Sequence, residues 1–143
     1  MTVGLILAQK GREVETAEPG VPVSRIVDVL ASRRIGAIVI VGEGGRLAGI
    51  VSERDIVREI SRRGASILDQ PVSSCMTRAV VTCSEQDTVE HVMGVMSQNR
   101  FRHLPVVTEG RLAGIVSIGD VVKRKIEQAE RDAADLRNYI AMS

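Results

Sequence analysis

Hydrophobic positions along the chain follow two periods that alternate from one segment to the next. Apolar residues three and four apart, as in Ile26, Val27 and Leu30, are typical of a helix with one buried face. This spacing predicts helices over 23–34 and 88–100. Short apolar runs bounded by turn residues instead predict strands at 14–17, 37–41, 47–51, 80–83, 104–107 and 112–116.

Both ends of the chain are also predicted to be helical. A short helix over 2–10 is followed by Gly11, which is placed as a C-terminal stop. The last helix is expected to open at Ser117 and to run to about Ile140, because apolar residues continue at helical spacing up to that point. This length exceeds what a compact unit needs. We therefore expect its apolar stripe to pack on the N-terminal helix or on a second subunit.

An octapeptide, GRLAGIVS, occurs twice, at 45–52 and at 110–117, and an aspartate follows each copy three residues later. The likeness extends upstream, where the offset between the copies is 66 residues instead of 65, because the turn at 42–45 holds one extra residue. Each copy is predicted to have the order β-α-β-β-α, and residues 64–77 join the two. Two copies indicate a closed, pseudo-symmetric pair and not an open solenoid.

Composition narrows the class of protein and of partner. The chain has 143 residues and 19 basic against 18 acidic side chains, so no global field attracts nucleic acid or an anionic membrane. One Phe, one Tyr and no Trp argue against a single-strand stacking platform, so a bound base is expected to lie between aliphatic side chains. Cys75 and Cys83 are interpreted as reduced apolar residues of a cytoplasmic protein, and we expect no metal site, no leader and no membrane span.

The segments Ser52–Asp55 and Ser117–Asp120 permit two interpretations. A serine followed three positions later by an acid is the pattern of a capping box, in which the two side chains satisfy the first N–H groups of a helix. The same helix start is also an anion site, and a carboxylate beside it can accept hydrogen bonds from the paired hydroxyls of a ribose. The two roles are compatible with each other.

Taken together, these features resemble a known family. The β-α-β-β-α order, the two segments Gly49–Asp55 and Gly114–Asp120, and the run Arg102-His-Leu-Pro-Val look like tandem cystathionine-β-synthase (CBS) domains, known as a Bateman module. The likeness covers about 14–125 and implies an α+β fold of two units packed through their sheets about a pseudo-twofold axis. The expected divisions are an N-terminal helix at 1–11, a first unit at 12–66, a connector at 67–77, a second unit at 78–126 and a helical extension at 127–143.

The resemblance further implies that the clefts between the units bind an adenosine-containing ligand, with AMP favoured and ATP or NAD(H) as alternatives. It places Asp55 and Asp120 on ribose hydroxyls, and Ser52 and Ser117 near ribose or phosphate. The other residues expected to line these clefts are Thr16, Thr82, Ala37, Ile38, His103, Leu104 and Pro105.

The two clefts are not expected to be equal. Arg54 aligns with Gly119, while Arg102 and His103 align with Gly36 and Ala37. If these three cationic side chains face one another across the pseudo-twofold axis, they converge on the phosphates of one ligand, and one cleft dominates. The alternatives are a solvated surface arginine for Arg54 and a half-buried, hydrogen-bonded residue for His103.

Three functions remain open at this level. The first is a non-catalytic regulatory module that binds an adenine nucleotide and acts on a separate effector protein, as a homodimer. The second is an enzyme, for instance a nucleotide hydrolase with Asp55 or Asp120 as base, although the chain has no P-loop, metal-ligand cluster or histidine-activated nucleophile. The third is a structural homodimer in which the serines and aspartates only cap helices.

Overall fold

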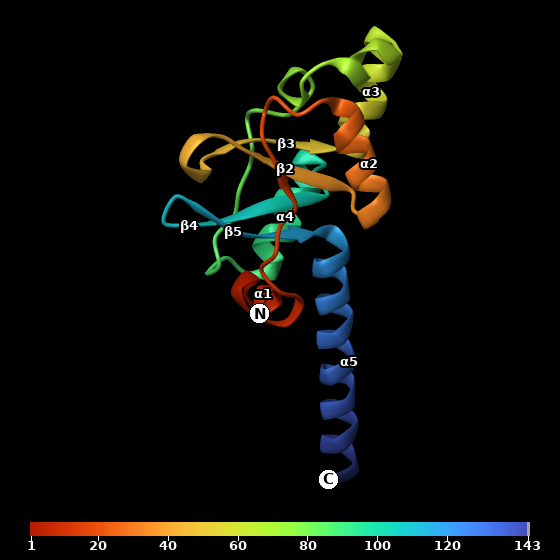
Figure 1. The fold of residues 1–143 in the computed structure, drawn as a ribbon. Helices are drawn as coiled ribbons and strands as arrows, with labels where there is room; N and C mark the ends of the chain where they lie inside the picture. The colour runs from red at the N-terminus through yellow and green to blue at the C-terminus, as the bar shows by residue number, and fades with distance from the viewer. Residues whose placement is uncertain (143) are drawn as a thin grey trace.

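The structure is a computed structural model and describes residues 1–142. A compact body holds both repeats, and one long helix projects from it (Figure 1). The first repeat consists of β1 (Thr16–Ala17), α2 (Val23–Arg33), β2 (Ala37–Val41), β3 (Leu47–Ser52) and α3 (Glu53–Arg63). The second consists of α4 (Val89–Asn99), β4 (His103–Thr108), β5 (Arg111–Ser117) and α5 (Ile118–Met142). Outside them lie α1 (Val3–Lys10) and the short 3-10 turns η1 (Glu43–Gly45), η2 (Ala65–Asp69) and η3 (Val72–Ser74).

Each repeat forms its own small sheet, and the two sheets lie next to each other in the middle of the body (Figure 1). In the first sheet β1 runs parallel to β2, and β2 runs antiparallel to β3. In the second sheet β4 runs antiparallel to β5. The α+β order predicted from the sequence is therefore confirmed, with one exception at the start of the second repeat.

The strand predicted over 80–83 is wrong except at its last residue. Cys83 makes a single parallel bridge to Val106, at the place where β1 pairs with β2 in the first repeat. Before it, the Val80 N–H donates to the Arg78 carbonyl at 3.0 Å, which turns the backbone. Residues 80 and 81 are thereby free to line a cavity, as described below.

The two repeats have separate hydrophobic cores, and each core includes a segment from outside its own repeat. The first core combines α2, β2 and β3 with Ile67, Val72, Cys75 and Met76 of the segment that joins the repeats. The second core combines α4, β4 and β5 with Val3, Ile6 and Leu7 of α1. The joining segment and α1 thus occupy equivalent places on the two repeats.

Backbone hydrogen bonds confirm this equivalence. Val72 donates to the Val21 carbonyl at 2.8 Å, and Val3 donates to the Asp87 carbonyl at 2.9 Å. The Val23 N–H donates to Gln70 in the first repeat, as the Val89 N–H donates to Met1 in the second. Each covering segment precedes one repeat in the sequence and packs on the other. The predicted connector at 67–77 is therefore a folded part of the first repeat's core.

Gly49 and Gly114, which come from the repeated octapeptide, allow these close approaches. A Cβ at Gly114 would lie 2.8 Å from a methyl carbon of Leu7 in α1. A Cβ at Gly49 would lie 2.7 Å from the sulfur of Met76 in the joining segment. Real Cβ contacts are essentially never this short. A Cβ at Gly49 would also lie 2.8 Å from the Thr77 carbonyl oxygen, so this position requires glycine, whereas a Cβ at Gly114 would displace the end of the Leu7 side chain.

The long helix α5 leaves the body soon after it begins. Val121 is its buried residue, and its first turns pack on α4 and β5. From Gln128 onward most of its side chains are exposed, and its last turns extend well below α1 in Figure 1. The apolar stripe of α5 does not pack on α1, because α1 is already engaged on β5. Of the two expected partners, α1 is therefore not the one that the stripe contacts.

Candidate functional site

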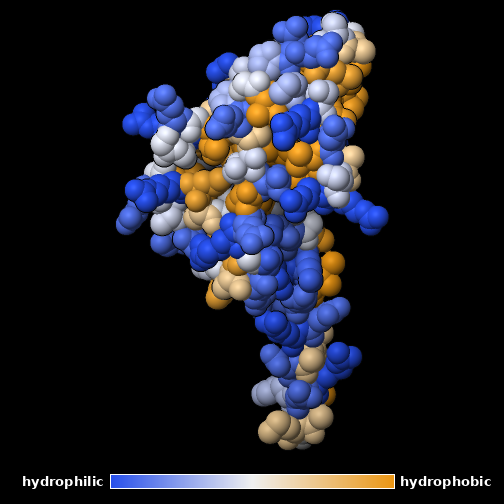
Figure 2. Space-filling view, viewed as in Figure 1, coloured by the Kyte–Doolittle hydropathy of each residue, from blue (hydrophilic) through white to orange (hydrophobic). Residues whose placement is uncertain are grey.

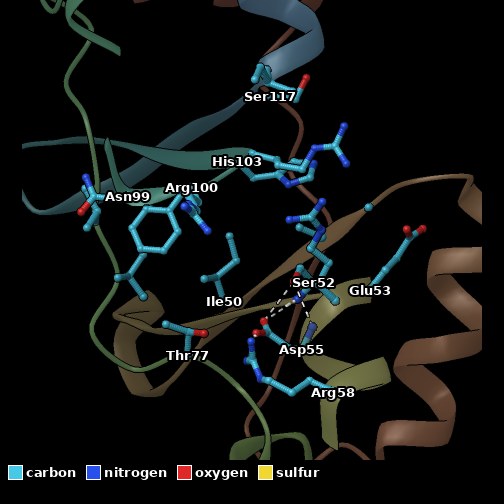
Figure 3. Close-up of a pocket in the computed structure, with 18 of the residues that line it drawn as sticks. Ile50, Ser52, Glu53, Asp55, Arg58, Thr77, Asn99, Arg100, His103 and Ser117 are labelled. Carbon is cyan, nitrogen blue, oxygen red and sulfur yellow. Dashed lines mark hydrogen bonds and ion pairs between the residues drawn. The ribbon is translucent and has the colours of Figure 1, made fainter. Parts of the chain in front are cut away.

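A cavity of about 730 Å³ lies between the two repeats, at the C-terminal end of β3 (Figure 3). One wall comes from the first repeat and carries Ser52 and Asp55 at the start of α3. The facing wall comes from the second repeat and carries the turn between α4 and β4. The main lining residues on these walls are Ile50, Ser52, Glu53, Arg54, Asp55, Arg58, Thr77, Val80, Val81, Asn99, Arg100, Phe101, Arg102 and His103.

A second cavity of about 780 Å³ is built from the pseudo-symmetric counterparts of these residues. Ile115 and Ser117 take the places of Ile50 and Ser52, and the turn between α2 and β2 replaces the turn between α4 and β4. Each cavity therefore combines the strand end of one repeat with the turn of the other. The two cavities meet at Gly36, Ala37, His103 and Ser117, which line both.

Both helix starts are capping boxes. At the start of α3, the Ser52 N–H donates to Asp55 Oδ2 at 2.9 Å, and the Asp55 N–H donates to Ser52 Oγ at 3.3 Å. At the start of α5, the Ser117 N–H donates to Asp120 Oδ2 at 2.9 Å, and the Asp120 N–H donates to Ser117 Oγ at 3.2 Å. The capping role predicted from the sequence is confirmed at both places.

Asp55 lies at the edge of the first cavity and has a second partner there. Its Oδ1 accepts a hydrogen bond from Arg58 Nη2 at 2.6 Å, one turn further along α3 (Figure 3). The side chain of Arg58 is 58% exposed, so solvent weakens this pair and the guanidinium is able to move aside. A carboxylate has about four acceptor sites in all. Asp55 therefore retains capacity for a ligand while it caps the helix.

Asp120 has a different partner, which comes from the other end of the chain. Lys10 Nζ, at the end of α1, donates to Asp120 Oδ2 at 2.7 Å and to the Ile115 carbonyl at 2.9 Å. Burial acts to raise the pKa of Asp120, but the hydrogen bonds from Lys10 and Ser117 outweigh it and hold this pKa below its usual value. Asp120 is absent from the lining of both cavities, and Lys10 lines the second cavity in its place.

The cationic side chains gather in the first cavity. Arg54 from α3 lines the same cavity as Arg102 and His103 from the second repeat, and Arg58 and Arg100 lie there too. Four arginines against the two carboxylates Glu53 and Asp55 make this cavity locally positive, in a chain whose net charge is only +1. The first cavity is therefore able to attract an anion.

His103 sits between the two cavities and packs on the first repeat. A Cβ at Gly36 would lie 3.1 Å from the His103 ring, so the ring lies directly over this glycine. Burial lowers the pKa of His103, and the charges of Arg102 and Lys10 lower it further. The imidazole is consequently neutral at pH 7, and one ring nitrogen is available as a hydrogen-bond donor.

Several of the residues expected from the sequence lie elsewhere. Ile38 and Leu104 are each 1% exposed in the two cores, and Pro105 is buried on β4, so none of the three lines a cavity. At these positions the strands are covered by core residues or flanked by neighbouring strands, so none of the three side chains can reach a cavity. Thr16 and Thr82 are exposed, but the residues just before them line the cavities instead. Ala37 lines both cavities.

The sequence alone did not single out five of the lining residues. Arg100 caps the C-terminus of α4 in the left-handed conformation, with φ of 57°, and Arg34 does the same after α2, with φ of 54°. Their alignment at the 66-residue offset was a usable signal. Phe101 also lines the first cavity, so the expectation of purely aliphatic surroundings is wrong there. Lys10 and Arg58 reach their aspartates through contacts that repeat alignment does not reveal.

Within residues 1–142, no three His, Cys, Asp or Glu side chains are grouped so that they could hold a metal ion. Among the helices of these residues, none combines the length and the apolar character that crossing a bilayer requires.

Comparison with known proteins places this geometry in a family. A model of the CBS domain matches residues 11–62 and 72–127, and the chain therefore belongs to the CBS-domain family and carries two tandem copies of the domain. The CBS domain-containing protein CBSX3, mitochondrial, from Arabidopsis thaliana is 36% identical over 118 residues. That alignment covers 80% of this chain and 57% of the relative, so the chain matches little more than half of the relative's length.

Solved structures of CBS-domain proteins have the same fold. The CBS-domain containing protein ATU1752 from Agrobacterium tumefaciens is 44% identical, with a TM-score of 0.84 over 87% of this chain and 92% of that one. The CBS domain pair of protein MJ0100, in complex with 5-methylthioadenosine and S-adenosyl-L-methionine, is 27% identical with a TM-score of 0.79 over 90% and 98%. Protein PAE2072 from Pyrobaculum aerophilum, complexed with AMP, is 27% identical with a TM-score of 0.74 over 84% and 89%.

Proposed function

We propose that the protein is a non-catalytic regulatory module that binds an adenosine-containing nucleotide in the first cavity. The observation that carries this proposal is the convergence of Arg54, Arg100 and Arg102 on a cavity that also holds Ser52 and Asp55. The arginines suit a phosphate group, and the carboxylate suits the ribose hydroxyls. Two of the similar structures hold adenosine compounds, which supports this ligand class.

Within this class we propose AMP as the preferred ligand, with ATP and NAD(H) as the alternatives. The cavity is of the size that small-molecule sites have, and it contains Phe101 as an apolar surface for a base. The second cavity is the weaker site, because Lys10 already occupies the carboxylate of Asp120. One dominant site per chain is the result.

A ligand in the first cavity contacts both repeats, and this is the physical basis for regulation. It favours the relative orientation of the repeats that it fits best, by no more than its difference in affinity for the two orientations. We propose that the chain acts as a homodimer and that a separate effector protein reads this change. A reducing compartment such as the cytoplasm suits Cys75 and Cys83, whose thiols are buried and free.

A second candidate function is a structural homodimer without a nucleotide. It is favoured by the capping boxes, which give both serines and both aspartates a role in the fold itself. The two candidates differ in what a nucleotide does to the folded state, so ligand binding separates them.

The test is a thermal-shift panel of AMP, ADP, ATP, NAD, NADH and S-adenosylmethionine, followed by calorimetry of any compound that shifts the melting temperature. A ligand present at one hundred times its Kd should stabilise the fold by about 2.7 kcal/mol, which is readily measured. We expect AMP to bind with one dominant site per chain. If every compound leaves the melt unchanged, the structural homodimer is the better account.

A further inference from the structure

The projecting part of α5 carries an apolar stripe with the spacing of a coiled coil. Successive residues of the stripe are separated alternately by four and by three positions, so that they fall on the a and d positions of a heptad repeat. Written in order, they are Val122, Ile126, Ala129, Ala133, Leu136 and Ile140. An ordinary surface helix keeps a single broad apolar face toward its own domain. The apolar stripe of α5 is narrower than such a face and has the width of a coiled-coil seam, which a second helix covers.

The stripe lies on a side of the helix that the body does not use. Val121 is buried against the body, and the side chain of Arg124 is only 13% exposed, so the body covers that side of α5. By contrast, Val122 is 43% exposed, Ile126 is 54% exposed and Leu136 is 59% exposed. Figure 2 shows apolar side chains at the right edge of α5, where the helix leaves the body.

The charges beside the stripe indicate which helix fits it. In a parallel pair, each g position faces the e position five residues later in the partner helix. Lys125 at g then faces Glu130 at e of the second copy, and Asp132 at g faces Arg137 at e of the second copy. Both contacts join opposite charges. The two-fold axis of the pair repeats each contact, so the flanks of the stripe are complementary to themselves.

The antiparallel alternative places like charges together. When two antiparallel copies overlap along the whole stripe, e positions face e positions and g positions face g positions. Glu130 then meets Glu130 of the second copy, and Asp132 meets Asp132 of the second copy. Lys123 also meets Arg137 of the second copy. Such contacts are destabilising, so the charge pattern selects the parallel arrangement.

We propose that the α5 segment from Val122 onward pairs in parallel and in register with the same segment of a second copy, as a two-stranded coiled coil. This inference deepens the homodimer of the proposed function and names its interface. The segment is about 30 Å long. The paired segments place the two bodies side by side at one end of the coiled coil. There, Lys125 gives up its contact with Glu90 of its own chain and pairs with Glu130 of the second copy. The nucleotide cavities lie on the body and are separate from this seam.

Cysteine cross-linking distinguishes the arrangements. Ile126→Cys, Ala133→Cys and Leu136→Cys are made as separate variants of the full chain and oxidised mildly. In a parallel, in-register coil every one of these positions faces its own copy, so all three variants should run mainly as covalent dimers in non-reducing electrophoresis. Arg131→Cys, on the outer face of the same helix, is the matched control and should stay monomeric. The native Cys75 and Cys83 are buried, so the parent chain gives the background.

A charge exchange tests the register independently. Asp132→Arg alone and Arg137→Asp alone should each abolish the dimer in light scattering at concentrations where the parent chain is dimeric. The double variant restores opposite charges and should restore the dimer. Arg131→Asp makes the same kind of charge reversal on the outer face and should leave the dimer intact.

Other outcomes overturn the proposal. A monomeric parent chain does so, and so does a dimer in which none of the three cysteine variants cross-links. Such a dimer forms through the bodies or through fully overlapping antiparallel helices, in which Ile126 faces Leu136 of the second copy. Cross-linking at a single position indicates antiparallel helices that cross at that position. The melting temperatures of the same charge variants are measured separately with the panel of nucleotides. If a nucleotide still raises the melting temperature of a variant that forms no coiled coil, the proposed function stands. If the coiled coil forms but no nucleotide raises the melting temperature, the structural homodimer is supported.

Discussion

Asp55 and Asp120 occupy equivalent positions in the two repeats, and their neighbours give them different properties. Both cap a helix through the same pair of hydrogen bonds. Asp55 lines a cavity with four arginines, and its partner Arg58 is exposed. Asp120 is held by Lys10, which is only 29% exposed at its side chain. A Ser-x-x-Asp motif that recurs in both copies therefore supports one carboxylate that is paired within its own helix beside the first cavity, and one that is paired with the distant Lys10.

Substitution of the two aspartates separates capping from ligand binding. Asp55→Ala and Asp120→Ala should each cost about 1 kcal/mol of stability, because each removes one half of a capping box. Asp55→Ala should also weaken the nucleotide by about 1.5 to 3 kcal/mol, since its hydrogen bonds to the ribose are charge-assisted. Asp120→Ala should leave the affinity of the first cavity within a few-fold. Chemical denaturation and calorimetry measure the two effects.

Each aspartate variant is the control for the other, because the loss of a cap is common to both. An equal loss of affinity in the two variants would show that the cavities are equivalent. Unchanged affinity in Asp55→Ala, with the expected loss of stability, would limit Asp55 to capping.

Helices α1 and α5 are the first and last elements of the chain, and a single ion pair joins them. Lys10 ends α1, and Asp120 lies in the first turn of α5. Both side chains are partly buried, so the pair is less screened than a surface pair. The ion pair lowers the pKa of Asp120 and therefore favours folding while this carboxyl is ionised.

Lys10→Met tests this contact while it keeps the length and apolar stem of the side chain. The variant should be less stable than the parent by up to about 1 kcal/mol at pH 7. Because the folded pKa of Asp120 is lowered, the contribution of the pair is present above the unfolded pKa and is lost as the pH falls through the folded pKa. The difference between the two proteins should therefore be constant from about pH 7 to 5 and shrink below about pH 4.

Denaturation of both proteins at a series of pH values is the measurement. Lys123→Met, on the exposed side of α5, changes the same type of residue and should give no such pH dependence. A difference that persists undiminished at low pH would mean that Lys10 acts through packing and not through its charge.

Most elements could be predicted from the sequence, because helices and strands follow from the local period of apolar residues. The prediction failed at 80–82, where a turn hydrogen bond to Arg78 overrides a run of β-branched residues. It also missed the covering role of α1 and of 65–77, since local pattern does not tell which sheet a segment reaches. The same limit applies to the site. The motif residues Ser52 and Asp55 were predictable, whereas Lys10 meets Asp120 across most of the chain.

At the scale of the whole molecule, the two exchanged covers make the repeats depend on each other. Leu7 from α1 fills the second repeat above Gly114, and Met76 from the joining segment fills the first above Gly49. Neither repeat has a complete core within its own sequence. The two units are therefore expected to unfold together, although their cores are separate.

Two truncations of core side chains test the exchange. Leu7→Ala and Met76→Ala should each cost about 2 to 5 kcal/mol of unfolding free energy, because both side chains are buried. In native-state hydrogen exchange, Leu7→Ala should speed exchange first in β4 and β5, and Met76→Ala first in β2 and β3. Leu5→Ala, on the exposed side of α1, should change stability by less than about 0.5 kcal/mol. If Leu7→Ala loosened the first sheet first, the assignment of the covers would be incorrect.

The place of α1 in the second repeat also sets an order of events during synthesis. Its apolar residues are made roughly a hundred residues before the strand that they cover. At about 5 to 20 residues per second, this helix waits on the order of ten seconds for its partner, whereas the first repeat is covered as soon as residue 77 has emerged. Helix α1 thus stays undocked for most of the synthesis of the two repeats. Chaperones that bind exposed apolar segments have a longer opportunity at α1 than at the joining segment.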